Sequence, residues 1–159
     1  MKHAAQKQNA LVMAVACAAT LLQVGCSTLS VPMSPSTSNP SEATARFESV
    51  WFDGDGHGQW RFPWGFLAFE AKGTLLLFRD RLEFRRSDGT GFEMRNIRSV
   101  TLKNLRMTLA DPNQWVAVSY GSSPNTKEVY FLDGSSLGWG GATGGTQKML
   151  DAIRSRYSR

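Results

Sequence analysis

The residue with the most distinctive chemistry in this chain is Cys26, whose thiol follows Gly25 at the end of an apolar run. The run covers residues 10–22, and the segment before it carries Lys2 and Lys7 but no acidic residue. A positive start, a short apolar stretch and a small residue at the cleavage point are typical of a secretory signal. The run is shorter than the ~20 residues that a transmembrane helix needs. The sequence therefore predicts a processed N-terminus with a thiol nucleophile beside the cleavage site.

The segment LQVGC at residues 22–26 resembles the lipobox of bacterial lipoproteins. The resemblance implies that the Cys26 thiol receives a diacylglycerol, that the peptide is cut between Gly25 and Cys26, and that the new amine is acylated. Gln23 departs from the apolar residue that is usual at the third position before the cysteine. Ser27 replaces the Asp that retains many such proteins at the inner membrane. This implies a lipid anchor in the outer membrane of the cell envelope, with the protein facing the periplasm. Two or more acyl chains anchor a protein stably.

Two alternatives are open at the N-terminus. Cys17 is a second candidate thiol, but only a few apolar residues precede it. An ordinary secretory peptide would be cut near Ala19 or Gly25 and would leave Cys26 as a free thiol. Cleavage before Cys26 leaves 134 of the 159 residues with a net charge of +3. This length suits one domain with a tail, and the small charge gives no reason to expect a nucleic-acid partner.

Few residues in the cleaved chain could carry out catalysis. Its one histidine is His57, and its one cysteine is used by the anchor. A Ser-His-Asp or Cys-His mechanism would need His57, which lies in a glycine-rich stretch with no nucleophile motif nearby. A zinc site of His and Cys ligands would need more of both. We therefore expect no enzyme and no cofactor. The scattered acidic residues leave a carboxylate-dependent envelope hydrolase as an alternative.

Asp53, Asp55 and His57 occupy alternating positions before Gly58, which invites comparison with a calcium-binding loop. An EF-hand loop needs a bidentate Glu at its twelfth position, and that position is Trp64. The pattern therefore predicts a glycine-rich turn between strands and no metal site.

Residues 26–45 are rich in Ser, Thr and Pro and show no apolar periodicity. Such a segment cannot bury enough apolar surface to offset the entropy of ordering, and its prolines favour an extended chain. We expect a disordered tether that holds a domain of residues 46–159 away from the bilayer.

Alternation of apolar and polar residues, with turn residues between the runs, predicts a series of short antiparallel strands in this domain. In the most regular run Leu82 and Phe84 are expected to face the core. The residues that alternate with them are expected to face water, and these are Arg81, Glu83 and Arg85. A later run breaks its alternation near Asn96, which indicates a bulge or a corner. The predicted strands cover residues 48–53, 66–70, 73–78, 81–86, 92–102, 115–120 and 128–132.

The last segment, residues 146–157, is predicted to be an amphipathic helix because its apolar residues recur at helical spacing. They are Met149, Leu150, Ile153 and Tyr157. Short strands followed by one such helix predict a mostly β fold, in which the helix covers the open side of a small curled antiparallel sheet or barrel.

Apolar spacings over residues 66–157 resemble those of the GRAM and pleckstrin-homology-like barrel superfamily. They are Gly73-x-Leu75-x-Leu77, Leu82-x-Phe84 and Ile97-x-x-Val100, followed by two more strands and a helix. The resemblance implies a binding scaffold that is rarely catalytic. The lipid-headgroup residues of the superfamily do not carry over to positions in this sequence.

Aromatic and basic side chains make up the candidate interaction surface, which comprises Trp60, Trp64, Arg81, Arg85 and Trp139. The aromatic strip around Pro63 either contacts a partner or caps one end of the sheet. Trp139 lies in a glycine-rich loop that lacks the Lys of a phosphate-binding loop.

Six arginines fall on adjoining predicted strands, namely Arg79, Arg81, Arg85, Arg86, Arg95 and Arg98. They form either a positive patch that faces an anionic surface or a solvated face balanced by interspersed acidic residues. We expect a lipid-anchored module that binds a protein or another envelope component. The alternative is a module that binds anionic lipid at the membrane surface.

Overall fold

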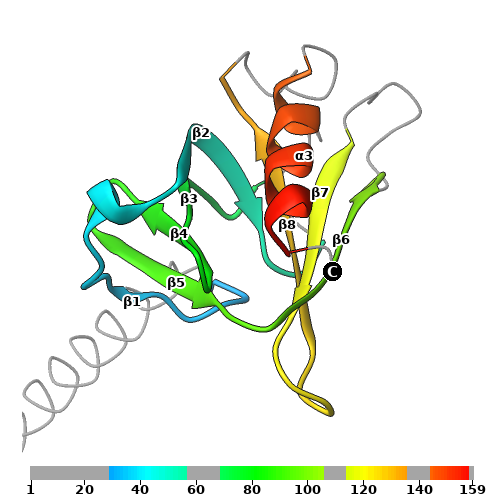
Figure 1. The fold of residues 1–159 in the computed structure, drawn as a ribbon, viewed down its shortest axis with the longest axis horizontal. Coiled ribbons are helices and arrows are strands. Elements are labelled where there is room, and N and C mark those ends of the chain that lie inside the picture. Colours follow the sequence, from blue (N-terminus) through cyan, green and yellow to red (C-terminus); the bar gives the residue numbers. More distant parts are fainter. Residues whose placement is uncertain (1–28, 57–68, 106–113, 136–143, 158–159) are drawn as a thin grey trace, which may run out of the picture.

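A computed structural model describes residues 29–56, 69–105, 114–135 and 144–157. In these residues eight strands form one curled sheet that does not close, and one α-helix, α3 (Gly145–Tyr157), follows them (Figure 1). The predicted fold class, mostly β with a C-terminal helix, is confirmed. The strands are β1 (Ser34–Pro35), β2 (Ala45–Asp53), β3 (Ala71–Leu77), β4 (Leu82–Arg86), β5 (Thr90–Met94), β6 (Ile97–Lys103), β7 (Trp115–Tyr120) and β8 (Lys127–Asp133).

The strands lie in the order β1-β5-β4-β3-β2-β8-β7-β6, and every neighbouring pair is antiparallel. Consecutive strands β5 and β6 therefore belong to opposite parts of the sheet. The corner between them contains Asn96, whose φ of 55° lies in the left-handed region. Asn tolerates this region better than most residues. The predicted break in the alternation near Asn96 is confirmed as this corner.

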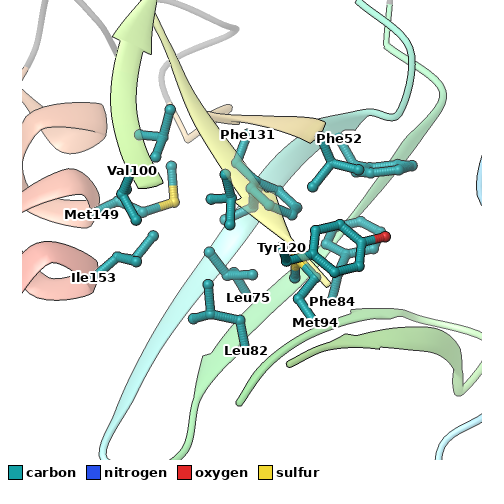
Figure 2. Close-up of a cluster of buried hydrophobic side chains, with 14 of the residues drawn as sticks. Phe52, Leu75, Leu82, Phe84, Met94, Val100, Tyr120, Phe131, Met149 and Ile153 are labelled. Carbon is teal, nitrogen blue, oxygen red and sulfur yellow. The ribbon is translucent and has the colours of Figure 1, made fainter. Parts of the chain in front are cut away.

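The core lies inside the curl of the sheet, where three phenylalanines from different strands meet (Figure 2). The ring of Phe52 lies 5.1 Å from that of Phe84 and 5.7 Å from that of Phe131, measured between centroids. All three side chains are fully buried. Tilted and offset contacts of this kind add to the stabilisation that apolar burial provides.

Helix α3 packs against β6, β7 and β8 and adds its apolar face to the same core. Met149, Leu150 and Ile153 are buried, as the helical spacing predicts. The hydroxyl of Tyr157 lies 2.7 Å from the carbonyl oxygen of Phe78 and 2.6 Å from that of Arg81. Burial raises the pKa of Tyr157 to about 12, so the hydroxyl keeps its proton at neutral pH. The C-terminal end of the helix is thus tied to the turn between β3 and β4.

Two predicted strand boundaries need correction. The strand expected at residues 66–70 is not present at Phe69 and Glu70, which precede β3; residues 66–68 lie outside the described part of the chain. Glu70 instead bonds the neighbouring loop through its carboxylate, which accepts hydrogen bonds from the backbone N–H groups of Ser30 and Gly54. Strand β2 begins earlier than expected, at Ala45, and its register shifts between Phe47 and Val50.

The largest difference from expectation is the N-terminal strap, which we define as residues 30–44. Val31 is 7 % exposed and packs into the core. β1 pairs with β5, and the amide of Ser36 donates to the carbonyl oxygen of Gly89 at 3.0 Å. Figure 1 shows this segment beside β5. The expected disordered tether is therefore wrong for residues 30–45, and the folded unit begins well before residue 46.

The physical reason is a polar attachment that apolar periodicity does not reveal. Glu83 was expected to face water, but it is 1 % exposed. Its carboxylate accepts hydrogen bonds from the hydroxyls of Ser36 and Ser38, and Arg85 bonds it from the same strand at 2.7 Å. A buried charge is tolerated when it is paired and hydrogen-bonded in this way. The serines that made the strap look disordered are the groups that attach it to β4.

Candidate functional site

The described surface carries a basic groove on the outer face of β2, β3 and β4, with a volume of about 480 Å³. Its charged walls are Arg46 from β2, Lys72 from β3, and Arg85 and Arg86 from β4. Pro40, Ser49, Gly73, Thr74, Leu76 and Ser87 complete the lining. Successive side chains of a strand point to opposite faces of a sheet. Lys72, Thr74 and Leu76 therefore face the groove, while Leu75 and Leu77 enter the core.

Gly73 lets the strands approach closely under the groove. A Cβ built at this position would lie 2.3 Å from the carbonyl oxygen of Arg85. Real side chains do not tolerate such a contact, so a residue with a side chain would push β3 and β4 apart. The glycine therefore helps to hold Lys72 and Arg86 in neighbouring rungs of the sheet, where Gly73 pairs with Arg86.

Three of the four cations in the groove already have acidic partners. Arg85 pairs with the buried Glu83, Arg46 pairs with Glu48, and Arg86 Nη2 lies 3.1 Å from Asp88 Oδ2. The last two of these pairs are solvent-exposed, and such pairs contribute about 0–1 kcal/mol. Lys72 is exposed and has no ion pair with any residue that the structure describes. It is the cation in the groove that is most available to an added anion.

The carboxylate of Glu48 lies beside Arg46, and its negative charge disfavours an anionic ligand at this end of the groove. The Thr74 hydroxyl donates to Glu48 Oε2 at 2.7 Å. This bond, together with the Arg46 guanidinium, outweighs the opposing effect of burial and lowers the pKa of Glu48 below its ordinary value. Glu48 is therefore ionised at neutral pH. The positive end of the groove is the end with Lys72 and Arg86.

The wall of the groove includes a residue in an unusual backbone conformation. Ser49 has a φ of 55°, in the left-handed region that non-glycine residues seldom adopt. It lies where the register of β2 shifts, and its carbonyl oxygen accepts the amide of Gly134 at 3.0 Å. A bulge bends its strand and increases the local twist, and Ser49 lines the groove at this point.

Asp53, Asp55 and Glu70 form an acidic cluster at the end of β2, where one oxygen from each lies within 4.8 Å of the others. The Asp53 carboxylate accepts the amides of Asp55 and Gly56, and that of Glu70 accepts the amide of Gly54. These bonds shape the turn that the glycine-rich sequence predicts. The absence of a metal site stays a prediction.

The structure places only part of the predicted interaction surface. Cys26, Trp60, Trp64 and Trp139 lie outside the described residues. Arg85 lies in the basic groove, where it holds the strap, donating to the carbonyl oxygen of Ser38 at 2.9 Å.

Arg81 lies outside the groove, in the turn just before β4, and its side chain is paired with neighbouring residues. Its guanidinium carbon is 4.2 Å from the centroid of the Phe78 ring, and it pairs with Asp80 and Glu93. Arg95 pairs with the same two acidic residues. The charges of Arg81 and Arg95 are therefore balanced by shared acidic neighbours, although the Arg81 side chain is largely buried.

Sequence reasoning missed Lys72 and Arg46 as members of one site. Neither lies in a run of basic residues, and they come from different strands. The outward phase of Lys72 in β3 was the one available signal. Its neighbours in the groove follow from the pairing of β2, β3 and β4.

No protein-family model matches this chain, and no curated protein or solved structure shows significant similarity to it. Among the described residues, no helix has the length and apolar character needed to cross a bilayer.

Proposed function

We propose that the protein is a lipid-anchored binding module of a bacterial cell envelope and that its basic groove binds an anionic group. The resemblance of residues 22–26 to a lipobox supports the anchor. The groove, with Lys72 and Arg86 at its positive end, supports the binding role and is the observation that carries the proposal. The curled sheet with its C-terminal helix supports the expected likeness to pleckstrin-homology-like binding scaffolds.

The chemistry of the groove favours a ligand with a phosphate-like group. Lys72 supplies an ammonium to the lining and Arg86 a planar guanidinium, and both groups are of the kinds that bind oxyanions in proteins. Such a group occurs in the headgroup of an anionic lipid and in soluble phosphate compounds. A lipid anchor would keep the first source near the groove at all times.

The anchor is tested by replacing Cys26 with serine in the full chain. We expect Cys26→Ser to leave the membrane fraction and to lose the added mass of the lipid, because the thiol that carries it is gone. Cell fractionation and intact-mass spectrometry measure both outcomes. Ser27→Ala is the matched control and should fractionate as the unmodified protein does. A Cys26→Ser protein that stays with membranes at its original processed mass would refute the anchor.

The groove is tested with full-length protein purified in a neutral detergent. A ligand that binds only the folded state raises the melting temperature as its concentration rises. We expect inorganic phosphate, or anionic phosphatidylglycerol added to the micelles, to raise the melting temperature of the protein. The increase should be lost in Lys72→Ala and kept in Lys127→Ala, whose exposed lysine lies on β8 away from the groove.

Sodium chloride at matched ionic strength controls for general screening. A response to phosphatidylglycerol alone would identify a lipid headgroup as the source of the phosphate. A response to both would identify the phosphate group itself as the determinant. Equal responses of Lys72→Ala and Lys127→Ala would show that the groove does not bind the anion.

A further inference from the structure

The N-terminal strap is attached to one end of the sheet from its first residues. The amide of Ser30 donates to Glu70 Oε2 at 2.9 Å, and the next residue, Val31, is buried. Gly54 is bonded to the same carboxylate. Ser36 bonds the hairpin at Gly89. We call this part of the molecule the proximal end and define it by Ser30, Gly54, Glu70 and hairpin residues 87–89.

The opposite end of the sheet is where the strap meets β2. The amide of Thr44 donates to the carbonyl oxygen of Leu77 at 2.7 Å, and Ala45 pairs with Leu77. We call this the distal end. The nine residues of β2 connect the two ends, which at about 3.3 Å per residue places them roughly 26 Å apart.

The early attachment of the strap leaves very little chain between the anchor and the fold. Three residues separate Cys26 from Ser30. A fully extended chain spans at most about 3.6 Å per residue, so Ser30 lies within roughly 14 Å of Cys26 in any conformation. A disordered segment reaching to residue 45 would have allowed the domain to move several times farther away.

We propose that the proximal end of the sheet faces the bilayer and is held at the level of the lipid headgroups, with the distal end pointing away from it. The partner of this surface is the lipid bilayer itself. The inference rests on the proposed lipidation of Cys26, and it adds the distance and the orientation of the domain to that proposal.

The anchor and the strap, rather than charge, hold this end at the membrane. The proximal end carries the acidic residues Asp53, Asp55 and Glu70, which an anionic bilayer does not attract. High salt should therefore leave the position of the domain unchanged, whereas an electrostatically bound domain would detach. Lys72 follows Glu70 by two residues, so the positive end of the groove opens at the side of this surface.

The orientation is tested with full-length lipidated protein in vesicles whose lipids carry a nitroxide at the headgroup. With Cys26 lipidated, one added cysteine gives a single site for a fluorophore. Asp55→Cys labels the proximal end, and Glu42→Cys labels the strap near the distal end, where both side chains are exposed. Asp88→Cys in the hairpin is a second proximal probe in case Asp55→Cys disturbs its turn. We expect quenching of the proximal probe to be at least about twofold stronger, given the roughly 26 Å between the ends.

A flexible Gly-Ser segment of about 20 residues, inserted after Thr28, is the matched control because it allows an end-to-end distance of roughly 25 Å. This insertion should bring the quenching of the proximal probe down to that of the distal probe. Equal quenching of both probes without the insertion would overturn the orientation, as would loss of proximal quenching in high salt. Intact-mass spectrometry on the same sample separates the two proposals. A missing lipid mass refutes the anchor, whereas equal quenching with the lipid present refutes only the orientation.

Discussion

At the scale of single residues, Glu83 has the most consequence for how the molecule is built. Burial raises its pKa, but the hydrogen bonds from Ser36, Ser38 and Arg85 and the charge of Arg85 outweigh burial, so the pKa lies below its ordinary value of 4.5. The carboxylate is therefore ionised over the neutral range and can accept all of these donors. Glu83, together with Arg85, thus attaches the strap to β4.

The lowered pKa of Glu83 predicts a pH-dependent contribution to stability. A carboxyl group whose pKa is lower in the folded state stabilises the fold above its unfolded pKa, and this stabilisation is lost as the pH falls through the folded pKa. We expect Glu83→Gln to lower the free energy of unfolding by roughly 1.5–3 kcal/mol at pH 7, the range for hydrogen bonds to charged groups. Urea unfolding at several pH values measures the difference.

The difference between the wild type and Glu83→Gln should shrink as the pH falls below 4.5, because the wild-type carboxyl group then becomes protonated. Glu42→Gln, at an exposed position of η1 (Pro40–Glu42), is the matched control and should show little effect at any pH. Hydrogen exchange at the Ser36 amide should accelerate in Glu83→Gln, since that amide bonds Gly89 only while the strap is attached. A difference that stays constant down to pH 3 would contradict this role of Glu83.

At the scale of elements, α3 completes the core of a sheet that does not close on itself. Its buried residues contact β6, β7 and β8, and Arg154 donates to the carbonyl oxygen of Val100 at 2.9 Å. The apolar face of the helix and the cluster of Phe52, Phe84 and Phe131 occupy adjoining parts of one core (Figure 2). An isolated helix of 13 residues is marginal in water, so its stability depends on this packing.

The packing of α3 predicts the cost of shortening its central apolar side chain. Ile153 is fully buried, and truncation of a buried Ile to Ala costs about 2–5 kcal/mol through lost burial and the cavity left behind. We expect Ile153→Ala to lower the free energy of unfolding by an amount in this range, measured by chemical denaturation. Lys148→Ala, on the exposed face of the same helix, should change it by less than about 0.5 kcal/mol. Similar values for the two variants would show that α3 does not contribute to the core.

At the scale of the whole molecule, the strap runs along the sheet from one end to the other. It begins at the proximal end, crosses the outer face of β4 through Ser36 and Ser38, and reaches the distal end at Thr44. The same crossing places Pro40 at the edge of the basic groove. The position of the groove, the attachment of the strap and the proposed orientation at the bilayer are therefore consequences of one arrangement of the chain.

Local pattern in the sequence was enough to predict much of this fold. The alternation of Leu82 and Phe84, the break near Asn96 and the helical spacing from Met149 to Tyr157 all report burial between neighbours in the chain, and the structure agrees with each. These features depend on periods of two or about 3.6 residues, which a single segment contains in full. The anchor at Cys26 likewise comes from one short segment, and it stays a prediction.

Tertiary structure alone decided the features that join distant parts of the chain. Glu83 has the outward phase of its strand. It is buried because Ser36 and Ser38, which precede it by 47 and 45 residues, cover its carboxylate. The groove unites side chains from β2, β3 and β4, and the acidic cluster needs Glu70 to meet the turn after Asp53. A periodic pattern shows which face of a strand is apolar. It does not show which polar segment will cover the other face, because that depends on hydrogen bonds between groups that only the fold brings together.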